Sequence, residues 1–246
     1  MTIGAGILKG IGTQCGKAIF ENIKLNGIKK FFLYKTKYRN KEIRLSVAYL
    51  IRINIRGKGY LLVKNSKIID QFQPVGGVYK YNREGLDFLK KIKFREDEGY
   101  KSNENNKNDL RIRIKGRFLS KFVRWFKSKN GREVTAYREF KEELLDTGIL
   151  KEEFFDEQNV DIRFETRVIG DMKFSNHFQC DEILISDIYD FYPNLQQEKE
   201  LKSLPNEDGN YRFFSYDEIK RLGKVSGEKE YRVGEHTLKI LEGEVE

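Results

Sequence analysis

The sequence predicts an α+β protein in which strands precede and follow one strongly amphipathic helix. Residues 43–55 and 60–65 are rich in β-branched and aromatic side chains, and a Gly-containing turn at 56–59 separates them. Two further runs of the same kind, 159–174 and 179–193, come after the helix. A hairpin before the helix and additional strands after it are therefore expected.

The helix is expected within Gly131–Gly148, with acidic and apolar side chains on opposite sides. At 100° per residue, Glu139, Glu142, Glu143 and Asp146 fall within an arc of about 100°. The apolar arc on the opposite side consists of Val134, Tyr137, Phe140, Leu144 and Leu145. Carboxylates crowded in this way repel each other unless a cation lies nearby. Because Mg²⁺ is held by a few carboxylates together with substrate phosphates, we predict Glu139, Glu142 and Glu143 as metal ligands. The alternative is a solvated charged face without a ligand.

The net charge of this 246-residue chain, +9, is concentrated in one segment. Between Lys90 and Asn130 there are 14 Lys and Arg residues against 5 Asp and Glu residues, so the remainder is neutral on balance. A local basic field beside a carboxylate cluster suits a polyanionic ligand that arrives with a metal, most simply a nucleotide. A solubilising segment that binds nothing is the alternative.

Residues 1–26 form a separate element in which glycines alternate with apolar side chains. Small residues four apart let helices pack closely, which predicts a Gly-rich apolar helix for oligomerisation or membrane targeting. Polar residues interrupt the apolar run, so a conventional membrane span is not expected, and a helix docked on the core is the alternative. Cys15 and Cys180 make no disulfide framework and no cleavable signal peptide is evident, so a cytoplasmic protein, membrane-associated if residues 1–26 bind lipid, is expected.

Several features occur in the order found in a known family. After the hairpin come Gly76 and Gly77, then the acidic helix, and much later the aromatic run Tyr211–Ile219 before a short helix. Over roughly residues 41–242, this order resembles the Nudix hydrolase domain. The Nudix box runs from a glycine through a glutamate to Arg-Glu-hydrophobic-x-Glu-Glu and a closing glycine. Its matches here are Gly77, Arg138, Glu139, Phe140, Glu142, Glu143 and Gly148.

The chain departs from that box in its spacing. A long basic insertion, residues 80–130, separates the first glycine from the arginine. The upstream glutamate of the box, eight residues before the arginine, falls on Asn130. Three additional residues, 145–147, delay the closing glycine. The metal-binding helix therefore matches the family, whereas the segment that shapes the substrate site differs.

The resemblance implies a mixed β-sheet sandwiched by helices, with Mg²⁺ as the cofactor. It makes Arg138, Glu139, Glu142 and Glu143 the catalytic residues, with the three glutamates holding the metal and the arginine orienting a carboxylate. Gly76 and Gly77 are expected at the ligand.

Further ligand contacts are predicted from aromatic residues beside basic ones. Aromatic faces and guanidinium groups bind bases and phosphates, which makes Arg124 and Trp125, in a basic aromatic helix of the insertion, candidate ligand contacts. A core role for the tryptophan is the alternative. His177 and Phe178, at the start of a later strand, are also candidates, with a structural role for the histidine as the alternative.

The overall layout resembles, more narrowly, the Nudix domains associated with bacterial CD-NTases, the cGAS-like nucleotide cyclases of anti-phage operons. This resemblance implies a nucleotide-sensing effector of CBASS-type defence. Residues 27–246, with the insertion at 80–130, would bind a cyclic oligonucleotide and signal to residues 1–26. The alternative is a Mg²⁺-dependent pyrophosphohydrolase acting on a nucleoside diphosphate derivative, so catalysis stays open. A homo-oligomer is expected, and nucleic acid is the less favoured partner.

Overall fold

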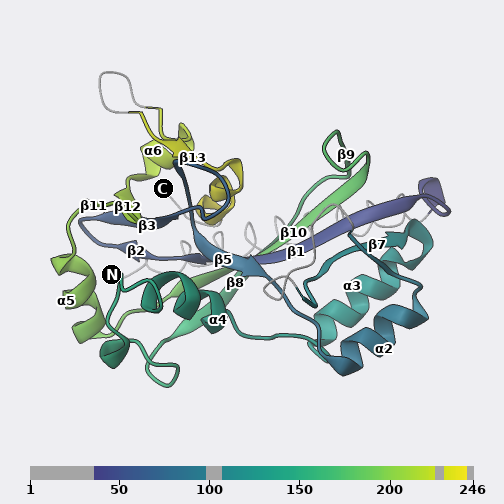
Figure 1. Ribbon diagram of the computed structural model, residues 1–246, viewed down its shortest axis with the longest axis horizontal. Helices are drawn as coiled ribbons and strands as arrows, with labels where there is room; N and C mark the ends of the chain where they lie inside the picture. The colour runs from purple at the N-terminus through teal and green to yellow at the C-terminus, as the bar shows by residue number, and fades with distance from the viewer. Residues whose placement is uncertain (1–35, 98–106, 225–229, 243–246) are drawn as a thin grey trace, which may run out of the picture.

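The computed structural model describes residues 36–97, 107–224 and 230–242, and within these ranges the chain forms two mixed β-sheets with helices around them (Figure 1). The first sheet contains β1 (Glu42–Arg52), β5 (Val75–Val78), β6 (Arg95–Glu96), β7 (Arg111–Lys115), β8 (Ile162–Ile169), β9 (Lys173–Ser175) and β10 (Cys180–Phe191). Its strand order is β6-β7-β1-β10-β8, with β5 also paired to β1 and β9 to β10. The central strands β1 and β10 are parallel and cross the middle of the molecule side by side (Figure 1).

The second sheet has the order β11-β12-β3-β4-β13, with β2 beside β3. Its strands are β2 (Asn54–Ile55), β3 (Gly59–Lys64), β4 (Gln71–Gln73), β11 (Glu207–Asp208), β12 (Tyr211–Phe214) and β13 (Arg232–Val233). The predicted hairpin is found where β1 continues into β2 and turns back into β3. The predicted α+β class is confirmed, but the division of the strands into two sheets was not predicted.

Alternation along β1 gives the first sheet two different faces. On one face Ile43, Leu45, Val47, Tyr49 and Ile51 are completely buried in the main hydrophobic core. The intervening side chains point to the opposite face of the strand, as the period of two requires. That second face carries Arg44, Ser46 and Ala48, followed by Leu50, and it is the part of the sheet that lines the cleft described below.

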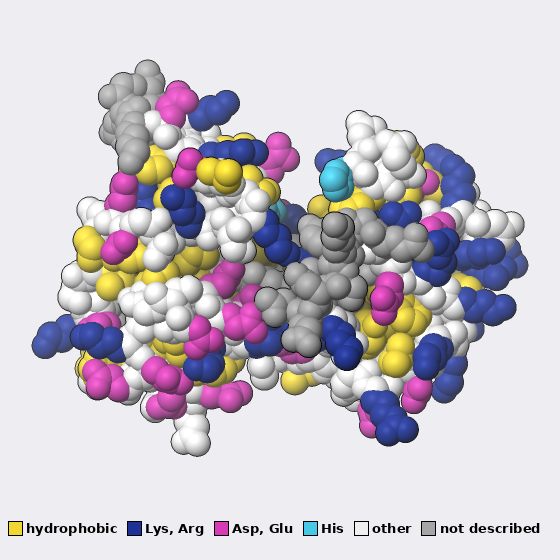
Figure 2. Space-filling view, viewed as in Figure 1, with side chains coloured by type: hydrophobic (Ala, Val, Ile, Leu, Met, Phe, Trp, Pro, Cys, Tyr) yellow, Lys and Arg dark blue, Asp and Glu magenta, His cyan; other side chains and the backbone are white. Residues whose placement is uncertain are grey.

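The insertion is part of the first sheet. It contains α2 (Arg83–Lys91), β6, β7, the 3₁₀ turn η2 (Gly116–Phe118) and α3 (Leu119–Ser128), and α3 is the basic aromatic helix predicted from the sequence. Strand β7 pairs with the Glu42–Ser46 half of β1, while β5 pairs with residues 48–51. Helix α3 buries Leu119, Phe122 and Phe126 in the main core. Lys and Arg side chains gather on the lobe that contains these elements, on the right in Figure 2.

The acidic helix begins later and winds differently from the prediction. It consists of α4 (Tyr137–Phe140) and a π-helical turn, η3 (Lys141–Leu145), in which Asp146 N donates to Lys141 O at 2.9 Å. Phe140, Leu144 and Leu145 are buried, as the apolar arc predicted. Val134, predicted on that arc, precedes the helix and is 45 % exposed, because the chain is not yet helical there.

A second core joins the two sheets. Leu50 of β1 and Ile188 of β10 pack with Tyr60, Leu62, Phe72, Phe214, Ile219, Val233 and Ile240. Through this core the 3₁₀ helix η5 (Glu235–Leu241) packs beside β1 and β10, and α6 (Tyr216–Lys220) beside η5. The remaining helical segments are η4 (Glu152–Phe154) and α5 (Leu195–Ser203).

The predicted glycine-rich helix, residues 1–26, lies outside the described residues. Over the three described ranges, no helix is both long enough and apolar enough to cross a membrane.

Candidate functional site

A cleft of about 610 Å³ lies over the polar face of the first sheet. Its floor is formed by paired residues of β1 and β10, namely Arg44 with Glu182, Ser46 with Leu184, and Ala48 with Ser186. The acidic helix and β5 form one wall, and η5 contributes His236 and Lys239. Figure 2 shows that the surface is hollowed between the two lobes. The small side chains in the middle of the floor leave room for a ligand.

Arg138 organises the acidic wall. Its Nε and Nη2 donate to the two carboxylate oxygens of Glu133, at 2.9 and 3.2 Å. Its Nη1 donates to Glu139 Oε1 at 2.5 Å and to Glu142 Oε1 at 3.4 Å, and Nη2 also donates to Val78 O at 3.1 Å. One guanidinium group therefore fixes the positions of three carboxylates against β5.

Glu133 is a site residue that the sequence analysis missed. The box spacing placed the upstream carboxylate at position 130, but Asn130 is exposed in the turn after α3. Glu133, only five residues before Arg138, makes the paired contact instead. The signal was present in the sequence as an acid just upstream of the helix, but the long insertion displaced it from the expected spacing.

Glu143 is held at the inner end of the acidic wall. Its Oε2 accepts a hydrogen bond from Gly76 N at 2.9 Å. Burial raises the pKa of the Glu143 carboxyl to about 8, and the negative charge of Glu139 adds to this, while the Gly76 hydrogen bond opposes it. At neutral pH this carboxyl is therefore mostly protonated. Burial likewise raises the pKa of Glu139, although Arg138 opposes the shift.

Gly77 is required by the close approach of β5 to the helix. A Cβ atom at this position would lie 1.8 Å from Glu139 Oε1 and 2.2 Å from its Cδ. A side chain there would push Glu139 away from Arg138. Gly76 is required for a different reason, because a Cβ atom there would lie 2.2 Å from Tyr49 O of the paired strand β1.

Charged groups also line the end of the floor remote from η5. The Arg44 guanidinium donates to Asp97 and to Glu182, each at 2.5 Å, and lies 3.7 Å from the centre of the Phe178 ring. Asp109 pairs with Arg111 at 2.7 Å. Burial raises the pKa of Asp109 to about 6, and the arginine opposes this shift. Phe178 thus offers an aromatic surface supported from one side by a cation.

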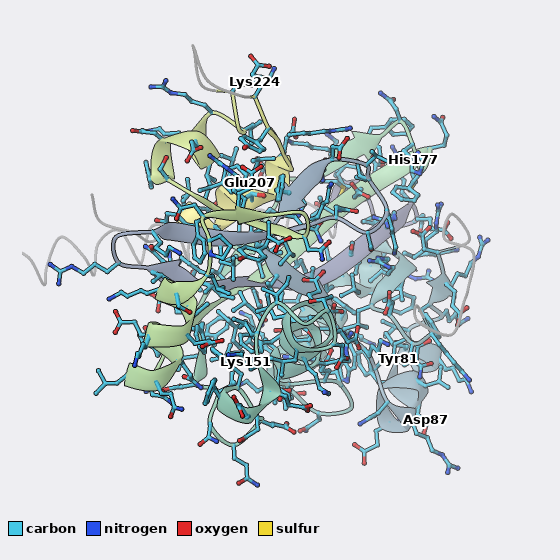
Figure 3. The ribbon with its side chains drawn as sticks, turned by 60° about the vertical axis from the view of Figure 1, so that its left-hand side comes forward. Tyr81, Asp87, Lys151, His177, Glu207 and Lys224 are labelled. Carbon is cyan, nitrogen blue, oxygen red and sulfur yellow. The ribbon has the colours of Figure 1, made fainter. Side chains whose placement is uncertain are left out.

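The structure brings together seven of the ten predicted site residues. The cleft is lined by Gly76, Gly77, Arg138, Glu139, Glu142, Glu143 and Phe178. Arg124, Trp125 and His177 are not among its lining residues. Trp125 stacks on Phe88 of α2, with ring centres 4.8 Å apart. His177 is exposed in the turn between β9 and β10 (Figure 3), and Arg124 is exposed on α3. Ligand contact by these three residues stays a prediction.

The donor chemistry of the acidic wall suits Mg²⁺. Glu139, Glu142 and Glu143 supply the carboxylate oxygens that this ion prefers, and when bound it would polarise a phosphoryl group. Within the described ranges, however, no three or more His, Cys, Asp or Glu side chains are grouped closely enough to hold a metal ion. Glu139 and Glu143 instead bind Arg138 and Gly76, and both would have to reorient to share an ion.

The glycine pair, the arginine-clamped acidic helix and the cleft beside them define a Nudix-type domain. A family model described as the SMODS-associated NUDIX domain matches residues 42–241. The chain belongs to this family, the Nudix domains associated with CD-NTase systems, as the sequence resemblance indicated. Comparison with curated proteins and with solved structures gives no match.

Proposed function

We propose that this Nudix domain is a sensor that binds a cyclic oligonucleotide in its cleft and transmits binding to residues 1–26. The observation that supports it best is the combination of groups around the cleft. Carboxylates suited to a metal form one wall, and Lys239 of η5 supplies a positive charge beside the small side chains of the floor. Arg44 and Arg111, at the far end, are paired with carboxylates and add little net charge. A phosphate-containing ligand needs both kinds of group, and about 610 Å³ is within the usual range for small-molecule sites.

The aromatic ring of Phe178 supports a nucleotide over a simple polyphosphate. It lies at the far end of the floor, where the Arg44 guanidinium packs on it at 3.7 Å. A base stacked on such a ring is held without hydrogen-bond readout, which typically contributes about 1–3 kcal/mol per base. A ligand that carries both phosphates and bases would use the whole cleft.

Titration calorimetry with cyclic di- and trinucleotides, with and without Mg²⁺, tests this proposal. We expect micromolar or tighter binding to at least one of them. Leu184→Trp should abolish it, because Leu184 is 40 % exposed on the cleft floor and a larger ring there blocks the space. Phe174→Trp is the matched control, since Phe174 is 58 % exposed on β9 and does not line the cleft. If none of the nucleotides binds to the wild type, the sensor proposal is wrong.

Hydrolysis of a nucleoside diphosphate linkage is the second candidate, and Glu133 is the observation that favours it. This residue supplies the upstream carboxylate contact to Arg138 that the spacing of the box had left unfilled. Turnover of a nucleotide panel with Mg²⁺ or Mn²⁺, lost in Glu142→Gln, would support catalysis. Equal inactivity of the wild type and this variant would count against it.

Self-association through residues 1–26 belongs to the same proposal. A Gly-rich apolar helix that responds to ligand would change its packing between protomers or against a membrane surface. Sedimentation of the full chain with and without the bound nucleotide measures this. An unchanged sedimentation coefficient, together with unchanged binding to anionic vesicles, would refute signalling through the segment.

A further inference from the structure

Lys239 is a half-buried cation that the acidic wall does not explain. It lies on η5 and lines the cleft together with His236 and Ser186. Its Nζ donates to Ser186 Oγ at 2.8 Å. Among the residues that the structure describes, no carboxylate lies within ion-pair distance of this ammonium group. A lysine in such a position has two further N–H donors, and these are available to the cleft.

The position of Lys239 is fixed by the packing around it. Its neighbour Ile240 is 1 % exposed in the second core, and Ile240 O accepts a hydrogen bond from Arg52 Nη1 at 3.0 Å. Arg52 in turn binds both carboxylate oxygens of Asp190, at 2.6 and 2.7 Å. These contacts attach η5 to β1 and β10, so the ammonium group is held above the floor by a rigid element.

Among the residues that the structure describes, the charged groups near Lys239 compensate its charge only in part. Burial lowers its pKa, and Glu242 opposes this shift only in part. Burial, and next the charge of Lys239, lower the pKa of His236, which favours a neutral imidazole beside the ammonium at neutral pH. A half-buried cation without an ion-pair partner is costly unless a ligand supplies the opposite charge.

We propose that Lys239, Ser186 and His236 form an anion subsite that binds one phosphate group of the ligand. Lysine acts as a point charge for phosphate, the serine hydroxyl orients the ammonium and can donate its own proton, and the imidazole can donate a further hydrogen bond. Lys239 and His236 lie on η5 and Ser186 lies on β10, whereas the carboxylates proposed to bind a metal lie on α4–η3, so the ligand's charge is met from two sides. The inference rests on the proposed nucleotide binding, and it adds the group that would anchor a phosphate.

Two quantities test the subsite in variants of Lys239, namely the affinity for the nucleotide and the melting temperature of the ligand-free protein. In Lys239→Met we expect the Kd for the best-binding cyclic nucleotide to rise by about tenfold or more, as loss of a charge-assisted hydrogen bond implies. The melting temperature of the ligand-free variant should stay equal or rise, because an uncompensated cation has been removed. Lys239→Arg should keep most of the affinity, and Ser186→Ala should lose part of it.

Lys202→Met is the matched control. Lys202 is 47 % exposed on α5 and pairs with Glu198 on the same helix, so its loss should change neither affinity nor melting temperature. If Lys239→Met does not fold, Lys239→Gln serves the same purpose with a polar side chain. Wild-type affinity in the folded variants would overturn the subsite while leaving the sensor proposal intact.

Binding of pyrophosphate tests the anion subsite independently of the sensor proposal. If the wild type binds no cyclic nucleotide, the sensor proposal fails, and the melting temperature is measured with and without pyrophosphate. A rise in the wild type that is lost in Lys239→Met would still support an anion subsite. Equal responses of the two proteins, including no response in either, would overturn it.

Discussion

Replacement of Glu133 by glutamine tests whether this residue supplies the upstream carboxylate of the Nudix box. The carboxylate accepts two charge-assisted hydrogen bonds from Arg138, and its side chain is only 15 % exposed. Hydrogen bonds to charged groups contribute about 1.5–3 kcal/mol each. The amide keeps one oxygen acceptor and Arg138 keeps Glu139, so we expect a net loss of about 2 kcal/mol in the free energy of unfolding.

Urea denaturation of four proteins measures this interaction directly. They are the wild type, Glu133→Gln, Arg138→Met and the double variant, and the double-mutant cycle should give a coupling energy of about 1.5–3 kcal/mol. Asn130→Ala is the control, because Asn130 occupies the expected box position but is exposed, and its replacement should cost less than about 0.5 kcal/mol. A coupling energy below about 0.5 kcal/mol, or a larger loss at Asn130 than at Glu133, would refute the assignment.

Three further predictions concern the helix, the glycine pair and the insertion. The pKa of Glu143 is raised from 4.5 to about 8, so the wild type loses stability as the pH rises through this range. Glu143→Gln cannot ionise, and its free energy of unfolding should therefore rise relative to that of the wild type by roughly 2–3 kcal/mol from pH 5.5 to pH 8.5. Urea denaturation in buffer that contains a metal chelator measures this gain. Glu142→Gln is the control, because the Glu142 side chain is 52 % exposed, and an equal gain there would contradict the explanation. Gly77→Ala should lower the free energy of unfolding by about 1–3 kcal/mol, because Glu139 must leave Arg138. Gly209→Ala, where a Cβ meets nothing within 4 Å, should be nearly neutral, and equal costs at the two sites would refute the steric reason. Trp125→Ala should lower the free energy of unfolding by about 2–3 kcal/mol, because it removes the stack on Phe88. The affinity for the nucleotide should change less than about twofold, and a large loss of affinity would instead support the ligand contact predicted from the sequence.

Features that depend on the order of neighbouring residues could be predicted from the sequence. The spacing of Phe140, Leu144 and Leu145 correctly predicted which side chains of the acidic helix are buried. The same local pattern placed Arg138 and its glutamates on one helix. These predictions depend on periodicity over a few residues, which the amino-acid order specifies directly.

The missed features depend on contacts between distant segments. The cleft floor exists because β1 pairs in parallel with β10, and Arg44 thereby lies beside Glu182, 138 residues later in the chain. Alternation predicts the two faces of a strand but not its partner. Lys239 and Ser186 meet for the same reason, since η5 and β10 are brought together by contacts between distant segments, including the second core. The π-helical turn at Lys141–Leu145 also has no simple signal in the residue types.

The pairing of β7 with β1 determines what would happen if the insertion were deleted. Its two ends lie next to each other, because Glu133 N donates to Lys80 O at 2.8 Å, so a short linker could rejoin the chain. The truncated protein would nevertheless have an unpaired strand edge at Glu42–Ser46 and would lose the α3 side chains that share the main core with Ile43 and Leu45. An open, apolar strand edge is a template for aggregation. A minimal domain built without residues 80–130 should therefore be insoluble.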